Sequence, residues 1–318
     1  MERSTAELRQ ALCGISGVHA TAYSTDGSID VAITTRIIER IVAGGIHNVV
    51  AAGNTGEFYA LAPDEIRLLH DTAITTAAGR SRVIAAVGRS LKEAIALGRR
   101  AAEAGADAIM SHQPLDPFAA PQSQAAYFRA IADSVDLPLV AYVRSDAIGL
   151  DDLLSIANHP NVVGVKFANT NLMLLAECVR ASSDRTAIWV CGLAEGWAVP
   201  FYAMGARGFT SGLVNVDPAR SLEIHRALEA GDYSAARARV TEIARFETLR
   251  TKYGNGANVT VVKEALCQLG FPVGPVRLPG LTALDATDRH TLVGEIARWH
   301  PGGNSHEMNV LRQRAVEE

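Results

Sequence analysis

The sequence predicts a closed barrel of eight parallel strands, each followed by a helix, with more helices after the barrel. Eight short apolar runs alternate with helical patterns, and most of these runs are apolar on both faces, as strands of a parallel sheet are. The strand signals stop at Asp217-Pro218, whereas helical spacing continues beyond that point. A count of eight favours a (β/α)8, or TIM, barrel over an open doubly wound sheet.

The expected strands share a short length, small or β-branched apolar residues and a turn signal at their end. In chain order they cover residues 17–23, 47–52, 82–87, 107–112, 137–142, 162–167, 186–191 and 208–211.

Helix starts carry recognisable signals between these strands. Asp30 is placed to cap a helix that ends at Gly44-Gly45, Pro63 suits the first turn of the next helix, and Ser90 opens a capping box with Glu93. Later barrel helices are expected at about 122–134, from 151, at 172–181 and at 195–204, and further helices at 217–229, 232–251, 259–269 and 288–299. We therefore predict a barrel domain over 1–215, a helical domain over 216–300 and a loosely ordered tail over 301–318.

Composition narrows the class of protein. The chain is 48% hydrophobic and 20% charged, as soluble globular proteins are. Its net charge of −4 and the lack of a basic cluster give no reason to expect a nucleic-acid partner. Four cysteines are scattered singly and nine histidines lack metal-ligand spacing, so no metal is expected. Because no signal peptide or membrane-spanning run is visible, the expected location is the cytoplasm, away from membranes.

Lys166 is the residue that does not fit its surroundings. It interrupts the run Val162-Val-Gly-Val-Lys-Phe167, and only four of the 30 basic residues are lysines. Burial penalises an ammonium group, so a lysine in such a strand tends to become a neutral, nucleophilic amine. The alternative is a lysine at a strand end whose apolar stem lets the charge reach water. The local sequence leaves both possibilities open.

In a barrel of this kind, chemistry gathers at the carboxyl ends of the strands and in the loops that follow. This rule selects a short set of candidates: Gly53, Asn54, Thr55, Gly56, Glu57, His112, Gln113, Tyr142, Arg144, Lys166, Gly192, Thr210 and Ser211. The Gly-x-x-Gly loop with Thr55 can form a cradle for a carboxylate, or it can simply be a tight turn. Tyr142 can act as an acid or base beside a lysine, or it can be an ordinary buried tyrosine.

Several motifs together resemble the dihydrodipicolinate synthase / N-acetylneuraminate lyase superfamily, whose class I members form a Schiff base. They are Gly53-Asn-Thr-Gly-Glu57, Ala104-Gly-Ala-Asp-Ala108, Tyr142, Val163-Gly-Val-Lys166, Gly205-Ala-Arg-Gly-Phe-Thr-Ser211, Val262-Lys-Glu-Ala-Leu266 and Gly274-Pro-Val-Arg277. The resemblance covers residues 14–284, almost the whole folded chain.

The resemblance implies a role for each candidate. Lys166 would form the imine with the ketone of a 2-oxo acid, and Tyr142 would handle its protons. The Thr55 hydroxyl and the amides of the loop around it, from Gly53 to Gly56, would hold the carboxylate, and Thr210 would offer a backbone carbonyl. The resemblance also implies a small-molecule substrate, no cofactor besides the covalent imine, and a homo-oligomer, either a dimer or a tetramer built from dimers.

Three departures separate the chain from true dihydrodipicolinate synthases. Asn54 stands where those enzymes have a second threonine, Leu115 and Asp116 stand where they have a tyrosine pair, and Ala147 replaces their arginine for the aldehyde substrate. The segment from Tyr142 to Ala147, which reads Tyr-Val-Arg-Ser-Asp-Ala, is instead similar to its counterpart in 5-dehydro-4-deoxyglucarate dehydratases. The sequence is therefore placed nearer to dehydratase-like members of the superfamily.

Three hypotheses follow. The first is a Schiff-base lyase that dehydrates, or cleaves by an aldol reaction, a 2-keto-3-deoxy sugar acid such as 5-dehydro-4-deoxyglucarate, with Arg144 and Asp146 near its distal groups. The second is a dihydrodipicolinate synthase that condenses pyruvate with aspartate semialdehyde. The third, of another class, is a catalytically silent protein that binds 2-oxo acids. The sequence assigns no role to His112 or Asp116.

Overall fold

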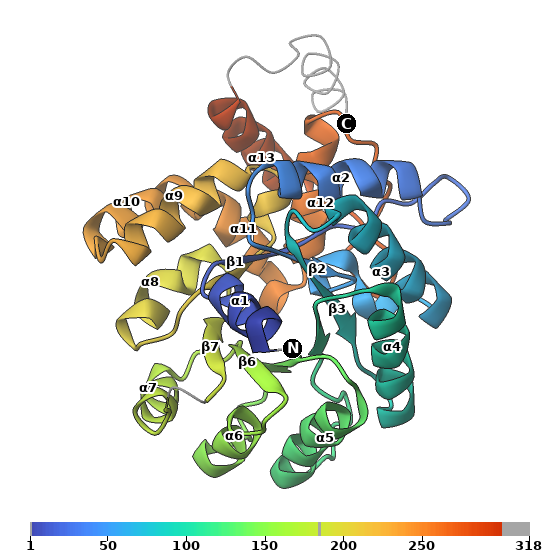
Figure 1. The fold of residues 1–318 in the computed structure, drawn as a ribbon. Helices are drawn as coiled ribbons and strands as arrows, with labels where there is room; N and C mark the ends of the chain where they lie inside the picture. Colours follow the sequence, from blue (N-terminus) through green and yellow to red (C-terminus); the bar gives the residue numbers. More distant parts are fainter. Residues whose placement is uncertain (1, 184–185, 301–318) are drawn as a thin grey trace.

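The short apolar runs form eight parallel strands that close into a barrel in the computed structural model, which describes residues 2–183 and 186–300 (Figure 1). The strands are β1 (Ile15–Val18), β2 (Asn48–Ala51), β3 (Arg82–Val87), β4 (Ala108–Ser111), β5 (Leu139–Val143), β6 (Val162–Phe167), β7 (Ile188–Cys191) and β8 (Phe209–Ser211). Each strand pairs with the next, and β8 pairs with β1. All strand residues except Arg82 and Ile188 are buried, which explains runs that are apolar on both faces. The predicted TIM barrel with additional helices is confirmed.

The helices that follow the eight strands lie around the barrel as a ring (Figure 1). They are α2 (Val31–Ala43), α3 (Pro63–Ala77), α4 (Leu91–Ala104), α5 (Pro121–Ser134), α6 (Leu150–Ala157), α7 (Leu172–Arg180), α8 (Glu195–Ala203) and α9 (Pro218–Glu229). The predicted N-cap bonds are present: a carboxylate oxygen of Asp30 accepts from the N–H of Ile33 at 2.9 Å, and Ser90 Oγ accepts from the N–H of Glu93 at 3.2 Å. These bonds satisfy donors that a helix leaves free in its first turn. The predicted capping box is only half formed, because the Glu93 carboxylate accepts from Arg89 Nη1 at 3.1 Å and not from the N–H of Ser90.

A first helix, α1 (Glu2–Leu12), precedes the barrel and was not expected from the polar N-terminus. It packs against β1, β6 and β7 and lies in front of the strands in Figure 1. Leu8 and Leu12, one helical turn apart, are both buried, and a side chain at Gly164 of β6 would lie 3.2 Å from Leu12 Cδ1. The i, i+4 leucine pair is the apolar stripe that holds this helix on the barrel.

The first strand is shorter and begins earlier than the predicted range of 17–23. It ends at Val18 because the backbone beyond it bonds to the side chain of Asn215. Asn215 Nδ2 donates to the carbonyl of Val18, and its Oδ1 accepts from the N–H of Ala20, both at 2.8 Å. The N–H of Tyr23 then donates to the carbonyl of Val273 at 2.9 Å. The apolar run therefore leaves the barrel and packs against the C-terminal part of the chain.

The helices after the barrel are α10 (Tyr233–Glu242), α11 (Ala244–Asn255), α12 (Asn258–Gln268) and α13 (Ala286–Trp299). The predicted helix at 232–251 is divided at Ile243, which is buried and has φ −102° and ψ 2°. The break has a tertiary cause, because α10 packs against α9 whereas α11 packs against α12 and α13. The domain division at residue 215 stays a prediction, and the predicted tail over 301–318 lies outside the described residues.

Candidate active site

A cavity of about 460 Å³, called here the barrel cavity, collects most of the candidate residues. Those that line it are Asn54, Thr55, Glu57, Tyr142, Arg144, Lys166, Gly192, Thr210 and Ser211. They come from the ends of β2, β5, β6, β7 and β8, as expected for the catalytic end of a TIM barrel. Gly53 and Gly56 belong to the same loop as Thr55 but do not line the cavity. His112, Asp116 and Asp146, which belong to other loops, do not line it either.

Lys166 is buried in β6, with 4% of its surface exposed. Burial, assisted by the positive charge of Arg144, lowers the pKa of Lys166 to about 7. A large fraction of the molecules therefore carry a neutral amine at neutral pH, and a neutral amine is the nucleophilic form of lysine. The snorkelling alternative does not describe this side chain, because its ammonium group does not reach bulk water.

Tyr142 lies beside Lys166, since the two residues are register partners in β5 and β6. Lys166 Nζ lies 3.8 Å from the centroid of the Tyr142 ring, and Asn54 Nδ2 donates to the Tyr142 hydroxyl at 3.0 Å. Burial raises the pKa of Tyr142, so the phenol stays protonated at neutral pH. Because the hydroxyl accepts from Asn54, its own proton is free to be donated to another group, such as a bound ligand.

The loop after β2 forms the 3-10 helix η1 (Asn54–Gly56). Its Thr55 is 4% exposed, and the N–H groups of its first turn have no partner within the helix. Gly53 allows a close approach, because a side chain there would lie 2.6 Å from Val18 Cγ1. The Thr21 hydroxyl donates to the carbonyl of Gly56 at 2.8 Å and fixes the loop against the chain that follows β1.

The two predicted residues of β8 differ in their surroundings. Thr210 lines the cavity, and its Oγ1 donates to the carbonyl of Cys191 at 3.4 Å. Ser211 Oγ donates to Glu195 Oε1 at 2.5 Å, and Ser221 donates to the same oxygen at 2.6 Å. The Ser211 hydroxyl is therefore committed to a buried carboxylate.

A set of aromatic rings lies next to Tyr142 that the sequence did not group together. His112 is fully buried, stacks on Phe58 with ring centroids 4.2 Å apart, and lies 5.3 Å from the Tyr142 ring. The Tyr59 hydroxyl lies 3.4 Å from His112 Nδ1. Burial, with a contribution from Lys166, lowers the pKa of His112 well below its usual value, so the imidazole is neutral. Tyr59 lines the barrel cavity.

The loops after β4 and β5 contain two of the three departures noted in the sequence, Leu115 with Asp116 and Ala147. Gln113 Oε1 accepts from the backbone N–H groups of Arg144 and Ser145, at 2.5 and 2.8 Å, and thereby fixes the segment that follows Tyr142. Leu115 is 66% exposed and Asp116 accepts from the N–H of Phe118, so neither approaches Tyr142 in this chain. The side chain of Arg144 reaches the barrel cavity from the exposed end of β5.

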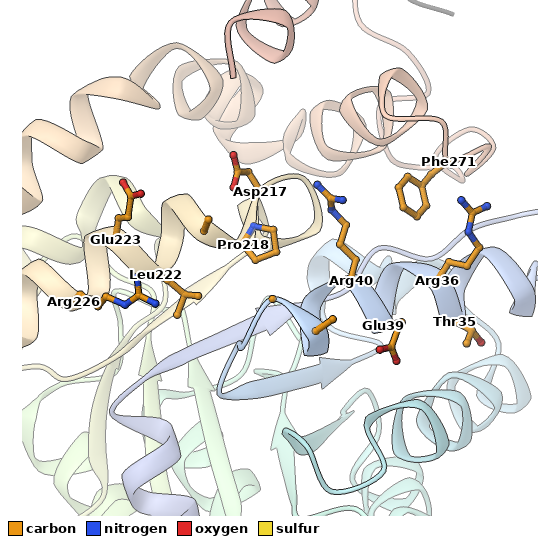
Figure 2. A pocket seen from close by; sticks show the side chains of 13 residues that line it. Thr35, Arg36, Glu39, Arg40, Asp217, Pro218, Leu222, Glu223, Arg226 and Phe271 are labelled. Atoms are coloured by element: carbon orange, nitrogen blue, oxygen red, sulfur yellow. The ribbon is translucent and has the colours of Figure 1, made fainter. Parts of the chain in front are cut away.

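A larger groove, of about 870 Å³, lies outside the barrel between α2 and α9 (Figure 2). Arg36 and Arg40 line it from α2, and Arg226 lines it from α9. It contains none of the candidate site residues, so the site is placed in the smaller barrel cavity. Within residues 2–183 and 186–300, no group of His, Cys, Asp or Glu residues could hold a metal ion. No helix of that part is long and apolar enough to cross a membrane.

Comparison with known proteins agrees with this geometry. The model of the dihydrodipicolinate synthetase family matches residues 11–297. The chain belongs to this family. The 4-hydroxy-tetrahydrodipicolinate synthase of Exiguobacterium sibiricum is 34% identical over 278 residues, which are 86% of this chain and 93% of that protein. Its counterpart in Corynebacterium aurimucosum is 31% identical over 280 residues, 86% of this chain and 89% of that one.

Solved structures of the family have the same fold. The dihydrodipicolinate synthase from Bacillus clausii superimposes with a TM-score of 0.89 and 38% identity, over 92% of this chain and 99% of that one. The dihydrodipicolinate synthase from Oceanobacillus iheyensis superimposes with a TM-score of 0.90 and 34% identity, over 93% of this chain and 99% of that one. The resemblance inferred from the motifs is thus confirmed at the level of the superfamily. Family members are class I Schiff-base lyases that need no cofactor, and this chain is an enzyme of that class. Its placement nearer to the dehydratases stays a prediction.

Proposed function

We propose that Lys166 attacks C2 of a 2-oxo acid, expels water and forms a protonated imine. The imine acidifies C3, and loss of a C3 proton gives an enamine that can attack an aldehyde; the reverse sequence breaks the same bond. Tyr142, whose phenol remains protonated beside the amine, passes protons to and from the intermediates. The observation that carries this proposal is the position of Lys166 beside Tyr142 in the barrel cavity, where its Nζ lies 3.8 Å from the centroid of the Tyr142 ring. Its burial there lowers its pKa to about 7.

Condensation of pyruvate with aspartate semialdehyde is the first specific candidate, because the relatives that are 31–34% identical bear the name 4-hydroxy-tetrahydrodipicolinate synthase. This ranking reverses the order given by the sequence motifs. Dehydration or aldol cleavage of a 2-keto-3-deoxy sugar acid is the second candidate. It is favoured by Asn54, whose amide donates to Tyr142 and cannot pass on a proton as a hydroxyl can.

Trapping and turnover together test the proposal. Borohydride reduction in the presence of pyruvate should leave a covalent adduct on Lys166, located by peptide mass spectrometry. Turnover is then measured with pyruvate plus aspartate semialdehyde, with pyruvate plus other aldehydes, and with 5-dehydro-4-deoxyglucarate while carbon dioxide release is followed. A wild-type protein without any adduct would contradict the Schiff base. An adduct without turnover of any substrate would favour the silent 2-oxo-acid-binding protein.

Replacing Tyr142 by phenylalanine should separate binding from proton transfer. The Tyr142→Phe protein is expected to lose about 10²- to 10⁴-fold in kcat, the usual contribution of one positioned acid–base group. Imine formation on Lys166 should remain detectable by borohydride trapping, because the amine and its burial are retained. Tyr127→Phe is a suitable control, since its hydroxyl donates to the carbonyl of Arg89 and it does not line the barrel cavity. Equal losses in both variants would contradict the role of Tyr142.

We also infer that the chain forms a homo-oligomer through the loop after β4. Phe118 is 93% exposed and Leu115 is 66% exposed on that loop, and a second copy of the chain would remove this apolar surface from water. Sedimentation velocity should show a dimer or tetramer, and Phe118→Ser should weaken it. A monomeric wild type would overturn this inference.

A further inference from the structure

Arg250 of α11 lines the same cavity as Lys166, although it comes from the helices that follow the barrel. Arg250 is 6% exposed, and two nitrogens of its guanidinium donate hydrogen bonds to neighbouring side chains. Nε donates to Asn258 Oδ1 at 2.8 Å, and Nη1 donates to Glu247 Oε1 at 2.6 Å. A guanidinium held at two points keeps its remaining N–H groups in a fixed direction, because the group is planar and rigid.

The third nitrogen, Nη2, has no hydrogen-bond partner among the residues that the structure describes. It lies close to Gly212, the residue that follows β8. A methyl group at Gly212 would lie 2.7 Å from Arg250 Nη2 and 3.3 Å from Thr55 Oγ1. The guanidinium and the threonine hydroxyl therefore both lie beside Gly212, and all three residues line the barrel cavity.

The residues around Arg250 hold its guanidinium in one orientation. Glu247 is its close partner, whereas Glu195 Oε2 lies 3.9 Å from Nη1 and has no hydrogen-bond partner within the described residues. Burial, together with repulsion by Glu247, raises the pKa of Glu195. Ser211, one of the predicted site residues, supports this arrangement by donating to Glu195.

We propose that Arg250 Nη2 and the Thr55 hydroxyl together bind the carboxylate of the 2-oxo acid and make the site select for that charge. The inference rests on the proposed Schiff base at Lys166 and adds a cation to its carboxylate subsite. A hydrogen bond from a buried guanidinium to a carboxylate is of the strong, charge-assisted kind. Arg250, and not only the exposed Arg144, is thus a determinant of substrate specificity.

Pyruvate and its uncharged methyl ester give a test that depends on charge. The concentration of each ketone that gives half-maximal borohydride trapping on Lys166 is measured for the wild type and for Arg250→Met. Arg250→Met is expected to raise this concentration about 10- to 100-fold for pyruvate, the effect of losing one hydrogen bond to a charged group. For methyl pyruvate the same concentration should not change. An equal increase for both ketones would indicate a merely structural role and would overturn the proposal.

Two further variants keep the test decisive if Arg250→Met does not fold. Gly212→Ala places a methyl group 2.7 Å from Nη2 and so displaces the guanidinium without removing any charge. Arg250→Lys retains the charge without the planar fork, and both variants should weaken trapping by pyruvate selectively. Arg245→Gln, on the same helix with its side chain 78% exposed, should leave both ketones unaffected. A wild-type adduct whose pyruvate dependence is unaltered in all three site variants overturns the role of Arg250 alone. Absence of any wild-type adduct overturns the proposed function itself.

Discussion

Replacing Lys166 by methionine is expected to reduce turnover by about 10⁴-fold or more, as removal of a covalent nucleophile does in other enzymes. Methionine resembles the apolar stem of lysine in length and carries no charge, so the barrel should fold around it. Rates are measured with the substrate that the panel identifies, and borohydride trapping with pyruvate should give no adduct. Residual turnover close to that of the wild type would show that Lys166 is not the nucleophile.

The same substitution is expected to change how stability depends on pH. The pKa of Lys166 is about 7 in the folded protein and about 10.4 in an unfolded chain, so between these values the unfolded chain binds more protons. The free energy of unfolding of the wild type therefore rises with pH across this interval. Methionine binds no proton, so Lys166→Met should gain most stability relative to wild type below about pH 7 and lose that advantage towards about pH 10.

Urea unfolding of both proteins at several pH values between about 6 and 10 measures this difference directly. Other titrating groups are common to the two proteins and largely cancel in the comparison. Lys92→Met is a matched control, because it makes the same substitution at an exposed lysine on α4. A difference between wild type and Lys166→Met that is independent of pH would contradict a buried, largely neutral amine.

Lys166 could be predicted from the sequence because two independent rules apply to it. The residues around it define a buried strand, and burial of an ammonium group requires a reason. Thr55, Tyr142 and Thr210 follow from one more rule, since the carboxyl ends of parallel strands meet at one edge of the barrel. All three line the same cavity as Lys166 in the structure.

The remaining features depend on contacts between distant segments. The bond from Asn54 to Tyr142 joins residues 88 positions apart, and Arg250 enters the cavity from a helix outside the eight strand–helix units. A helical pattern identifies the buried face of α11 but not the cavity which that face borders. The end of β1 was misplaced for the same reason, because Asn215, far along the chain, bonds to the backbone around Val18 and Ala20. The leucine pair of α1 was a local signal, and it was missed.

Breaking the buried ion pair of Glu57 and Lys263 is expected to destabilise the fold more than any surface substitution. Lys263 Nζ lies 2.9 Å from Glu57 Oε1 and donates to the carbonyl of Pro275 at 2.9 Å, while Glu57 Oε2 accepts from the N–H of Arg277. Both side chains are 3% exposed. Glu57→Gln leaves the ammonium without a countercharge, and the expected loss in the free energy of unfolding is about 3–5 kcal/mol. Urea unfolding measures it.

A double-mutant cycle distinguishes an unpaired charge from lost packing. Glu57→Gln with Lys263→Met removes both charges, so its loss should be smaller than the sum of the two single losses. Glu39→Gln is the control: Glu39 and its partner Arg80 are both about half exposed, so the loss should be much smaller than that of Glu57→Gln. Additive losses would contradict the pairing. Glu57 directly follows the turn that carries Thr55, so Glu57→Gln alone should also weaken pyruvate-dependent trapping on Lys166. Such a loss would link the active site to the ion pair that joins the barrel to the C-terminal helices.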